Sequence, residues 1–178
     1  METNVPNDKG IITALFNSKN DAESAYQELL DRKYTFHDID VIMSEETRNT
    51  HYGDDNVGKS ALGNKAAEGA GVGGAVGGVI GAIVGAIAAV GTAIALPGLG
   101  LVIAGPIVAA LAGAGAGGAT GGLIGGLVGY GIPEKTALEY ELGLKEGGIV
   151  LGFRPRNATE AGEVVSIWQK HNGQLIKS

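Results

Sequence analysis

The sequence predicts an α+β fold in which a glycine-rich helical hairpin interrupts a single α/β domain. No residue from 69 to 133 is charged, and 22 of the 32 glycines lie in this stretch. On either side of it, apolar residues recur with the spacings of strands and helices. We therefore expect residues 1–65 and 133–178 to form the two halves of the domain and residues 66–132 to form the hairpin.

The first half of the domain has the pattern of a strand, a helix and a second strand. The run GIITALF, residues 10–16, is rich in β-branched and apolar residues, as strands are. Asn17 and Ser18 can cap a following helix, which keeps an apolar face as far as about Arg32. From Ile39 to Met43 apolar residues then alternate, which predicts a strand with one buried face.

The second half repeats these elements after an additional helix. Proline is favoured at the start of a helix and glycine at its end. In order, the pattern predicts a helix from Pro133 to Gly147, the strand Ile149–Phe153, a helix capped by Asn157 or Thr159, and the strand Gln174–Lys177. Trp168 falls on the apolar face of the last helix, so we expect it in the core.

Neither half is large enough to fold alone, because two strands with one or two helices bury too little surface. Joined, they have the order β-α-β, insertion, α-β-α-β. This order predicts a ferredoxin-like split βαβ sandwich with one extra helix. The hairpin would then leave and re-enter the domain between its second and third strands.

Glycines in the predicted hairpin recur every fourth residue, which places them on one face of a helix. Helices with such faces pack with their backbones in close contact, so this row is the candidate self-association site. It consists of Gly69, Gly73, Gly77, Gly81 and Gly85 in the first arm and of Gly113, Gly117, Gly121, Gly125 and Gly129 in the second. Pro97 and Gly98, near the midpoint, supply the turn.

The opposite faces of the two arms carry isoleucine, valine and leucine. Glycine costs a helix in water up to about 1 kcal/mol relative to alanine, so these arms need lipid or a packed assembly around them. The hairpin could span a membrane and return, or dip into it, with both ends on one side. Alternatively, several copies could form a soluble homo-oligomeric scaffold with the zippers as its inner core.

Composition excludes several functions. The absence of cysteine excludes disulfides and thiol chemistry, and a net charge of −6 without a basic cluster argues against nucleic acid as a partner. Residues 1–10 contain no apolar run of the kind that a secretory signal needs. We therefore expect both termini in the cytoplasm, with the protein itself and membrane lipid as its partners.

Residues 53–60, GDDNVGKS, match the phosphate-binding pattern G-x-x-x-x-G-K-[ST]. A phosphate loop follows a buried strand directly, whereas residues 47–52 are polar. Asp54 and Asp55 would also repel phosphate. A nucleotide-binding regulator is therefore the least favoured alternative, and we expect no cofactor.

Two groupings of histidine with carboxylates resemble partial metal sites. They are His51 with Asp54 and Asp55, and His37 with Asp38 and Asp40. Without further ligands, a solvated loop and a strand edge explain them better. We expect no metal site, no catalytic residue and no enzymatic activity.

Four segments carry a resemblance to a known family: GIITALFNSKNDAESAYQELL, DIDVIMSEETR, LPGLGLVIAGPIVAALAGAGAGG and GIPEKTALEYELGLKEGGIVLGF. With them, nearly the whole chain resembles the bacterial glycine-zipper proteins related to general-stress and heat-induced stress proteins. The resemblance implies a bacterial protein on the cytoplasmic side with a link to stress. It implies no activity and no functional residues to carry over.

Overall fold

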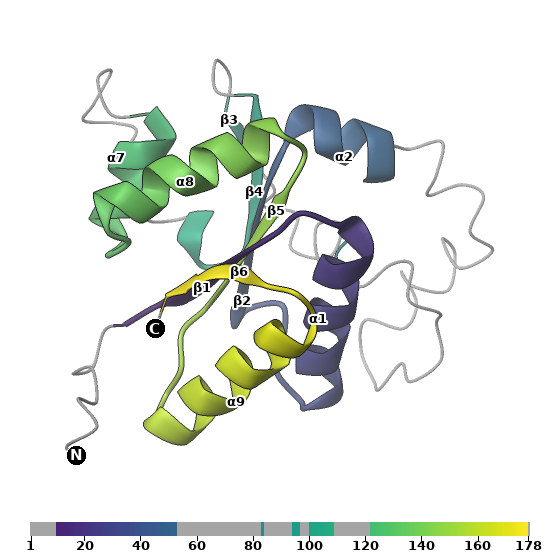
Figure 1. Ribbon diagram of the computed structural model, residues 1–178, viewed down its shortest axis with the longest axis vertical. Coiled ribbons are helices and arrows are strands. Elements are labelled where there is room, and N and C mark those ends of the chain that lie inside the picture. Colours follow the sequence, from purple (N-terminus) through teal and green to yellow (C-terminus); the bar gives the residue numbers. More distant parts are fainter. Residues whose placement is uncertain (1–9, 53–82, 84–93, 97–99, 109–121, 178) are drawn as a thin grey trace.

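A six-stranded antiparallel sheet with helices on both faces forms the protein, as a computed structural model shows for residues 10–52, 83, 94–96, 100–108 and 122–177 (Figure 1). The elements are β1 (Ile12–Phe16), α1 (Lys19–Asp31), β2 (Ile39–Ser44), α2 (Glu45–Tyr52), β3 (Ile94–Leu96), β4 (Leu101–Ala104), α7 (Gly122–Gly129), α8 (Glu134–Lys145), β5 (Ile149–Phe153), α9 (Ala158–Lys170) and β6 (Gln174–Lys177). The predicted α+β class is confirmed, and so are the helices and strands predicted in the two halves of the domain.

The strands lie in the order β3-β4-β2-β5-β1-β6. The four strands predicted from the flanks, β2, β5, β1 and β6, are neighbours in this order, and each adjacent pair is antiparallel. In the register, Val41 and Ala14 both pair with Leu151 in the centre of the sheet. Leu15 and Val150, which pair in this register, are 135 positions apart in the chain. The two flanks of the glycine-rich insert therefore form one continuous part of the sheet.

One face of the sheet is covered by α1 and α9. Alternate residues of β1, β2, β4 and β5 point into this core, as period-2 alternation requires. Its largest fully buried side chains include Phe16, Tyr26, Phe153 and Trp168. The rings of Phe16 and Trp168 meet edge to face with centroids 6.2 Å apart, which confirms the core position predicted for Trp168. We call this side the α1/α9 face.

The other face of the sheet is covered by α7 and α8, and we call it the α7/α8 face (Figure 1). Tyr140 on α8 donates to the Thr13 hydroxyl or to the Leu175 carbonyl oxygen, each 2.9 Å away. The prediction that β2 has only one buried face is therefore wrong, because Asp40 and Ile42 are buried beneath this second helical layer.

Residues 94–96 and 101–104 correct the prediction that residues 66–132 form an uninterrupted helical hairpin. They are strands β3 and β4, and β4 pairs with β2 while Leu96 pairs with Leu101. The chain thus reverses where the turn was predicted, although Pro97 and Gly98 themselves lie outside the described residues. Residues 101–104 contain no glycine and are apolar throughout, so they suit a strand that is buried on both faces.

Helix α2 occupies a segment in which the sequence showed only polar residues before the glycine-rich region. Ser44 ends β2, and its Oγ accepts the backbone N–H of Thr47 at 3.0 Å. This is the contact of a helix N-cap, and Glu45 and Glu46 follow in the first turn. In the sequence, the capping serine and the two acids that follow it were the signal that a helix begins here.

Within residues 10–52, 83, 94–96, 100–108 and 122–177, no helix combines the length and the hydropathy that crossing a membrane requires. Of the ten glycines in the predicted self-association row, the structure describes Gly125 and Gly129, both on α7. The helical conformation predicted for the second arm is confirmed at α7. Gly69, Gly73, Gly77, Gly81, Gly85, Gly113, Gly117 and Gly121 lie outside the described residues.

Candidate functional site

The candidate site is the junction between the glycine-rich insert and the α/β domain. Two carboxylates of the domain, Asp40 on β2 and Glu23 on α1, are each only 1% exposed. A buried carboxylate needs hydrogen-bond donors, because removal from water is costly. In both cases a backbone N–H of the insert is one of those donors.

Asp40 holds the start of the second arm. Its Oδ1 accepts the backbone N–H of Ile107 at 2.6 Å. Close approach of the two segments requires glycine at residue 105, where a Cβ would overlap the Ile39 carbonyl oxygen and the Asp40 side chain, and where φ is +100°. Across the sheet, a Cβ at Gly152 would come to 3.0 Å from the Cβ of Asp40. Asp40 therefore caps a distant helical turn, as an N-cap residue caps a local one.

Tyr130 and Arg154 complete the surroundings of Asp40. The Tyr130 hydroxyl donates to Asp40 Oδ2 at 3.3 Å, and Arg154 Nε donates to the Tyr130 oxygen at 3.1 Å. The Arg154 guanidinium also lies over the Tyr130 ring, 4.3 Å from its centroid. Burial raises the pKa of Asp40 to about 6, although the Ile107 and Tyr130 bonds and the charge of Arg154 act to lower it. Burial also raises the pKa of Tyr130 to about 12.

Glu23 holds the first arm on the opposite face of the sheet. Its Oε2 accepts the backbone N–H of Ile83 at 3.3 Å. Burial and the Glu23 charge raise the pKa of both Tyr26 and Tyr52 above the ordinary range. Ile83 is fully buried in the core of the α1/α9 face, whereas Ile107 belongs to the core of the α7/α8 face. At these two residues, the sheet therefore separates the arms that a hairpin zipper would place in contact.

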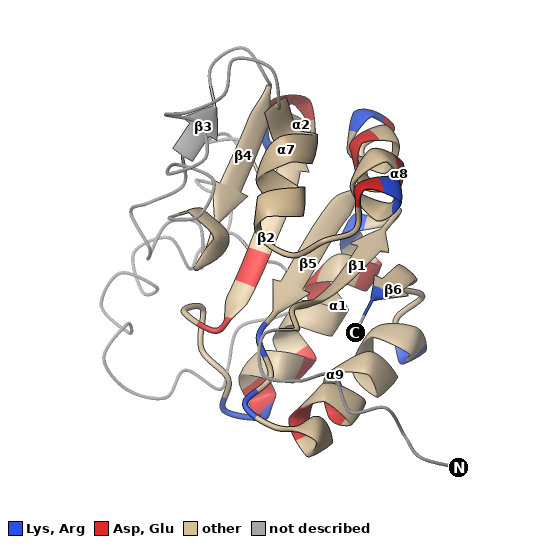
Figure 2. Cartoon of the chain, turned by 90° about the vertical axis from the view of Figure 1, so that its left-hand side faces the viewer, with Lys and Arg blue, Asp and Glu red and all other residues tan. Residues whose placement is uncertain are grey.

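Helix α7 turns its leucines inward and its glycine row outward. Leu127 is 0% exposed and Leu123 is 5% exposed, both in the core of the α7/α8 face. Gly125 and Gly129 are exposed, and an added Cβ at either would meet nothing within 4 Å. Val128, beside them, is 43% exposed. Acidic and basic residues lie on α8 but not on α7 (Figure 2). The outward face of α7 therefore consists of small, uncharged residues.

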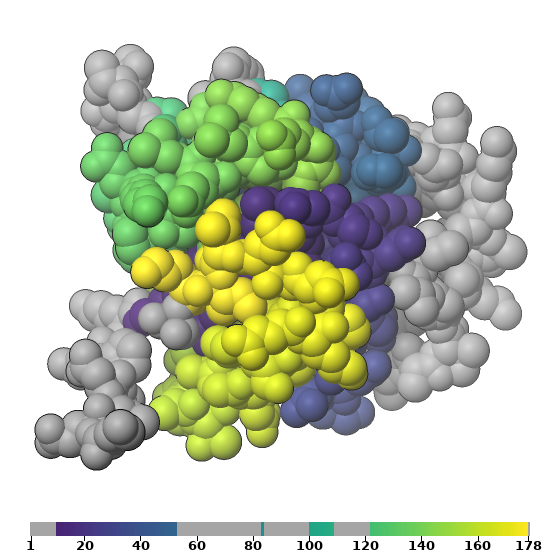
Figure 3. All heavy atoms as spheres, viewed as in Figure 1, coloured from purple at the N-terminus to yellow at the C-terminus, as the bar shows by residue number. Residues whose placement is uncertain are grey.

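A cleft of about 840 Å³ opens beside α7. Its floor is apolar, with Leu101, Leu123 and Leu144, and its rim is acidic, with Glu45 and Glu46. Lys145 on the same rim is bound to Glu141 at 2.6 Å, one turn away on α8. Figure 3 shows α7, α8, α9 and β6 on one face of the molecule, with α1 and α2 beside them.

His37, Asp38 and Asp40, one of the two groupings that resemble partial metal sites, do not form a metal site. Asp38 accepts the Thr35 N–H and hydroxyl at 2.9 and 2.8 Å and pairs with Arg156 at 3.2 Å, while Asp40 is buried as described above. Among the residues that the structure describes, no group of three or more His, Asp or Glu side chains is placed to bind a metal ion. Asp54 and Asp55 lie outside those residues.

The segment Gly53–Ser60 also lies outside the described residues. Directly before it the chain forms helix α2, whereas a phosphate loop follows a strand. The chain matches no model of a known protein family, no curated protein and no solved structure.

Sequence reasoning missed the two carboxylates that define the junction. From the sequence, Asp40 is interpreted as part of a solvated strand edge, and Glu23 is not among the candidate site residues. Asp40 lies between two apolar residues, Ile39 and Val41, whereas Glu23 lies between Ala22 and Ser24. Only for Asp40 did the immediate neighbours give a local signal of burial.

Proposed function

We propose that this chain is a non-enzymatic, self-associating protein with a structural or stress-protective role, and that the outward glycine face of α7 meets a second copy. The observation that carries the proposal is the orientation of α7. Its leucine face is used by the chain's own core, so its glycine face is free to accept another helix at close range.

The α/β domain that carries this helix has, on our proposal, a ferredoxin-like core. The order β2-β5-β1-β6, antiparallel throughout, supports it, as does the placement of α1 and α9 together on one face. In this arrangement β3, β4, α7 and α8 are additions to the core. The stress-protective role rests on the resemblance of sequence alone.

The membrane contact predicted from the sequence required the bulky faces of the arms to meet lipid. Ile83, Ile107 and Leu127, which belong to those faces, are instead buried in the two cores of the chain. These three side chains are therefore not available to lipid in this structure. This difference favours an assembly built through protein contacts, so the test must separate the two.

The test compares two glycine-to-leucine variants by sedimentation of the purified chain without detergent. Gly125→Leu places a large side chain on the proposed contact and should convert the oligomer to a monomer. Gly162→Leu is the matched control, because Gly162 is also exposed on a helix, α9, with nothing within 4 Å of an added Cβ. It should leave the assembly unchanged.

A monomeric wild-type chain, or an assembly that Gly125→Leu leaves intact, would contradict the proposal. Alkaline carbonate extraction of membranes from expressing cells tests the lipid contact separately. Wild-type protein that stays in the extracted membranes would show that the insert also enters lipid.

A further inference from the structure

The surroundings of Asp40 are unusual because its carboxylate is buried without a cation bonded to it. Among the described residues, its hydrogen-bond donors are the Ile107 backbone and the Tyr130 hydroxyl. Arg154, whose charge acts on Asp40, bonds to the Tyr130 oxygen. The hydrogen bonds between the insert and the sheet at this point therefore come from neutral donors, which offset only part of the cost of removing the carboxylate from water.

We propose that Asp40 is a pH-dependent latch, which holds the segment around Ile107 on the sheet more tightly as the pH falls from neutral towards 4. When the segment is docked, the carboxyl group is enclosed between Ile107, Tyr130 and the sheet. When the segment opens, the carboxyl group regains water. Protonation removes the cost of burial and still leaves oxygen lone pairs for the Ile107 N–H, so the acid form favours the docked state.

The direction of this pH dependence follows from the groups around Asp40. Tyr130 on the α7–α8 connection and Arg154 after β5 face it on the α7/α8 side, and Tyr26 on α1 interacts with it from the other side of the sheet. Against these, burial raises the pKa of Asp40 from 3.8 to about 6. The docked state thus binds the proton more tightly than the open one, and opening becomes easier as the pH rises between these two values.

A difference of about two pKa units corresponds to about a hundredfold change in the opening equilibrium. The change should occur between about pH 4 and pH 6, and the equilibrium should be level above about pH 7. The inference does not rest on self-association, because it concerns a contact within one chain. A monomer could carry the same latch.

Amide hydrogen exchange, resolved by residue and corrected for intrinsic exchange rates, measures the opening directly. In the wild-type chain the protection factor of the Ile107 amide should be about a hundredfold lower at pH 7 than at pH 4 or slightly below. The Leu151 amide, in the central strand β5, reports unfolding of the whole domain. Ile107 should be less protected than Leu151 at every pH, because the segment opens without the sheet.

Asp40→Asn is the matched variant, because it keeps an oxygen acceptor for Ile107 and cannot ionise. Its Ile107 protection should be the same at pH 4 and pH 7. Tyr130→Phe, which removes a donor that favours the carboxylate, should move the upper end of the transition to higher pH.

A wild-type Ile107 protection factor that is level between pH 4 and pH 7 would overturn the latch, and this result needs no variant to fold. Equal protection of Ile107 and Leu151 at every pH would overturn it as well, since the segment would then open only with the whole domain. Persistence of the pH dependence in Asp40→Asn would assign it to another group and would have the same consequence.

Discussion

The two faces of the sheet bury similar side chains but are assembled from different parts of the chain. The α1/α9 face is covered by helices from the two charged flanks, and ion pairs join these helices at the surface. The insert adds Ile83 to this core, where its N–H donates to the buried Glu23. On the α7/α8 face, α8 comes from a flank, but α7 and Ile107 come from the uncharged insert. There, the polar link is the buried carboxylate of Asp40, which accepts from Ile107 and Tyr130.

A glycine-rich stretch can therefore form part of the helical layer that covers a sheet, with its apolar side chains in an ordinary core. The glycines that recur every fourth residue lie on only one side of α7. The other side places Leu123 and Leu127 in the same core as Tyr140. An insert with two such faces can be docked on its own domain and still present a zipper surface outward.

We expect the largest change in the free energy of unfolding from a substitution that tests whether α7 belongs to the core. Leu127→Ala should lower the free energy of unfolding by about 3 kcal/mol, because a fully buried leucine loses its contacts and leaves a cavity. Val128→Ala on the exposed side of the same helix should cost less than about 1 kcal/mol. Urea denaturation of both variants measures the contrast.

Equal, small losses for Leu127→Ala and Val128→Ala would mean that α7 leaves the sheet in solution. In that case the α7/α8 face would be covered by α8 alone, and the comparison between the two faces would fail.

The flanks could be predicted from sequence because their signals are local. The strand Ile149–Phe153 was predicted with its observed bounds, and Asn157 does cap α9 by accepting the Glu160 N–H at 2.9 Å. In each case the residues that decide the structure lie within a few positions of one another, so the period and the capping residue suffice.

The junction could not be predicted, because its determinants lie far apart in the chain. Asp40 and Ile107 are 67 positions apart, and Glu23 and Ile83 are 60 apart. In an isolated strand or helix, either acid would face water, so local reasoning places both at the surface. The strand β4 was missed for a related reason: its apolar residues fit a helix as well as a strand, and only the free edge of β2 decides between them.

A smaller effect is expected at the polar contact between α8 and the sheet. Tyr140→Phe removes the hydroxyl that lies 2.9 Å from both the Thr13 hydroxyl and the Leu175 carbonyl oxygen. The loss should be about 1 kcal/mol, because buried acceptors lose a donor while the ring remains in place. Thermal or urea unfolding measures it, and Tyr34→Phe on the opposite side, whose ring is less buried, is the control with a loss near zero. A loss at Tyr140 no greater than that at Tyr34 would show that the hydroxyl does not help to fix α8.

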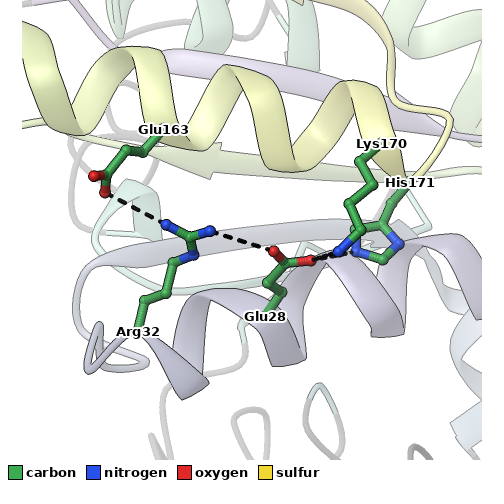
Figure 4. Close-up of polar contacts among 5 residues, drawn as sticks. All are labelled: Glu28, Arg32, Glu163, Lys170 and His171. Atoms are coloured by element: carbon green, nitrogen blue, oxygen red, sulfur yellow. Dashed lines mark hydrogen bonds and ion pairs between the residues drawn. The ribbon is translucent and has the colours of Figure 1, made fainter.

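The smallest effect concerns the surface network that joins α1 to α9 on the other face (Figure 4). Glu28 lies 2.8 Å from both Lys170 Nζ and His171 Nε2 and 3.5 Å from Arg32. The hydrogen bonds from Lys170 and His171 lower the pKa of Glu28 to about 2. Because the pKa is lower in the folded state than its ordinary 4.5, the network stabilises the fold above about pH 4.5 and loses this effect as the pH falls through 2.

Glu28→Gln should therefore lower the free energy of unfolding by about 0.5 to 1 kcal/mol at pH 7, since its cationic partners are largely exposed to solvent. At pH 2 the difference from the wild type should shrink to less than half. Glu141→Gln, which breaks the single surface pair with Lys145 on α8, is the control and should cost less at pH 7. An equal loss for Glu28→Gln at both pH values would show that its contribution is not ionic, and α1 and α9 would then not be joined by a surface ionic link as proposed.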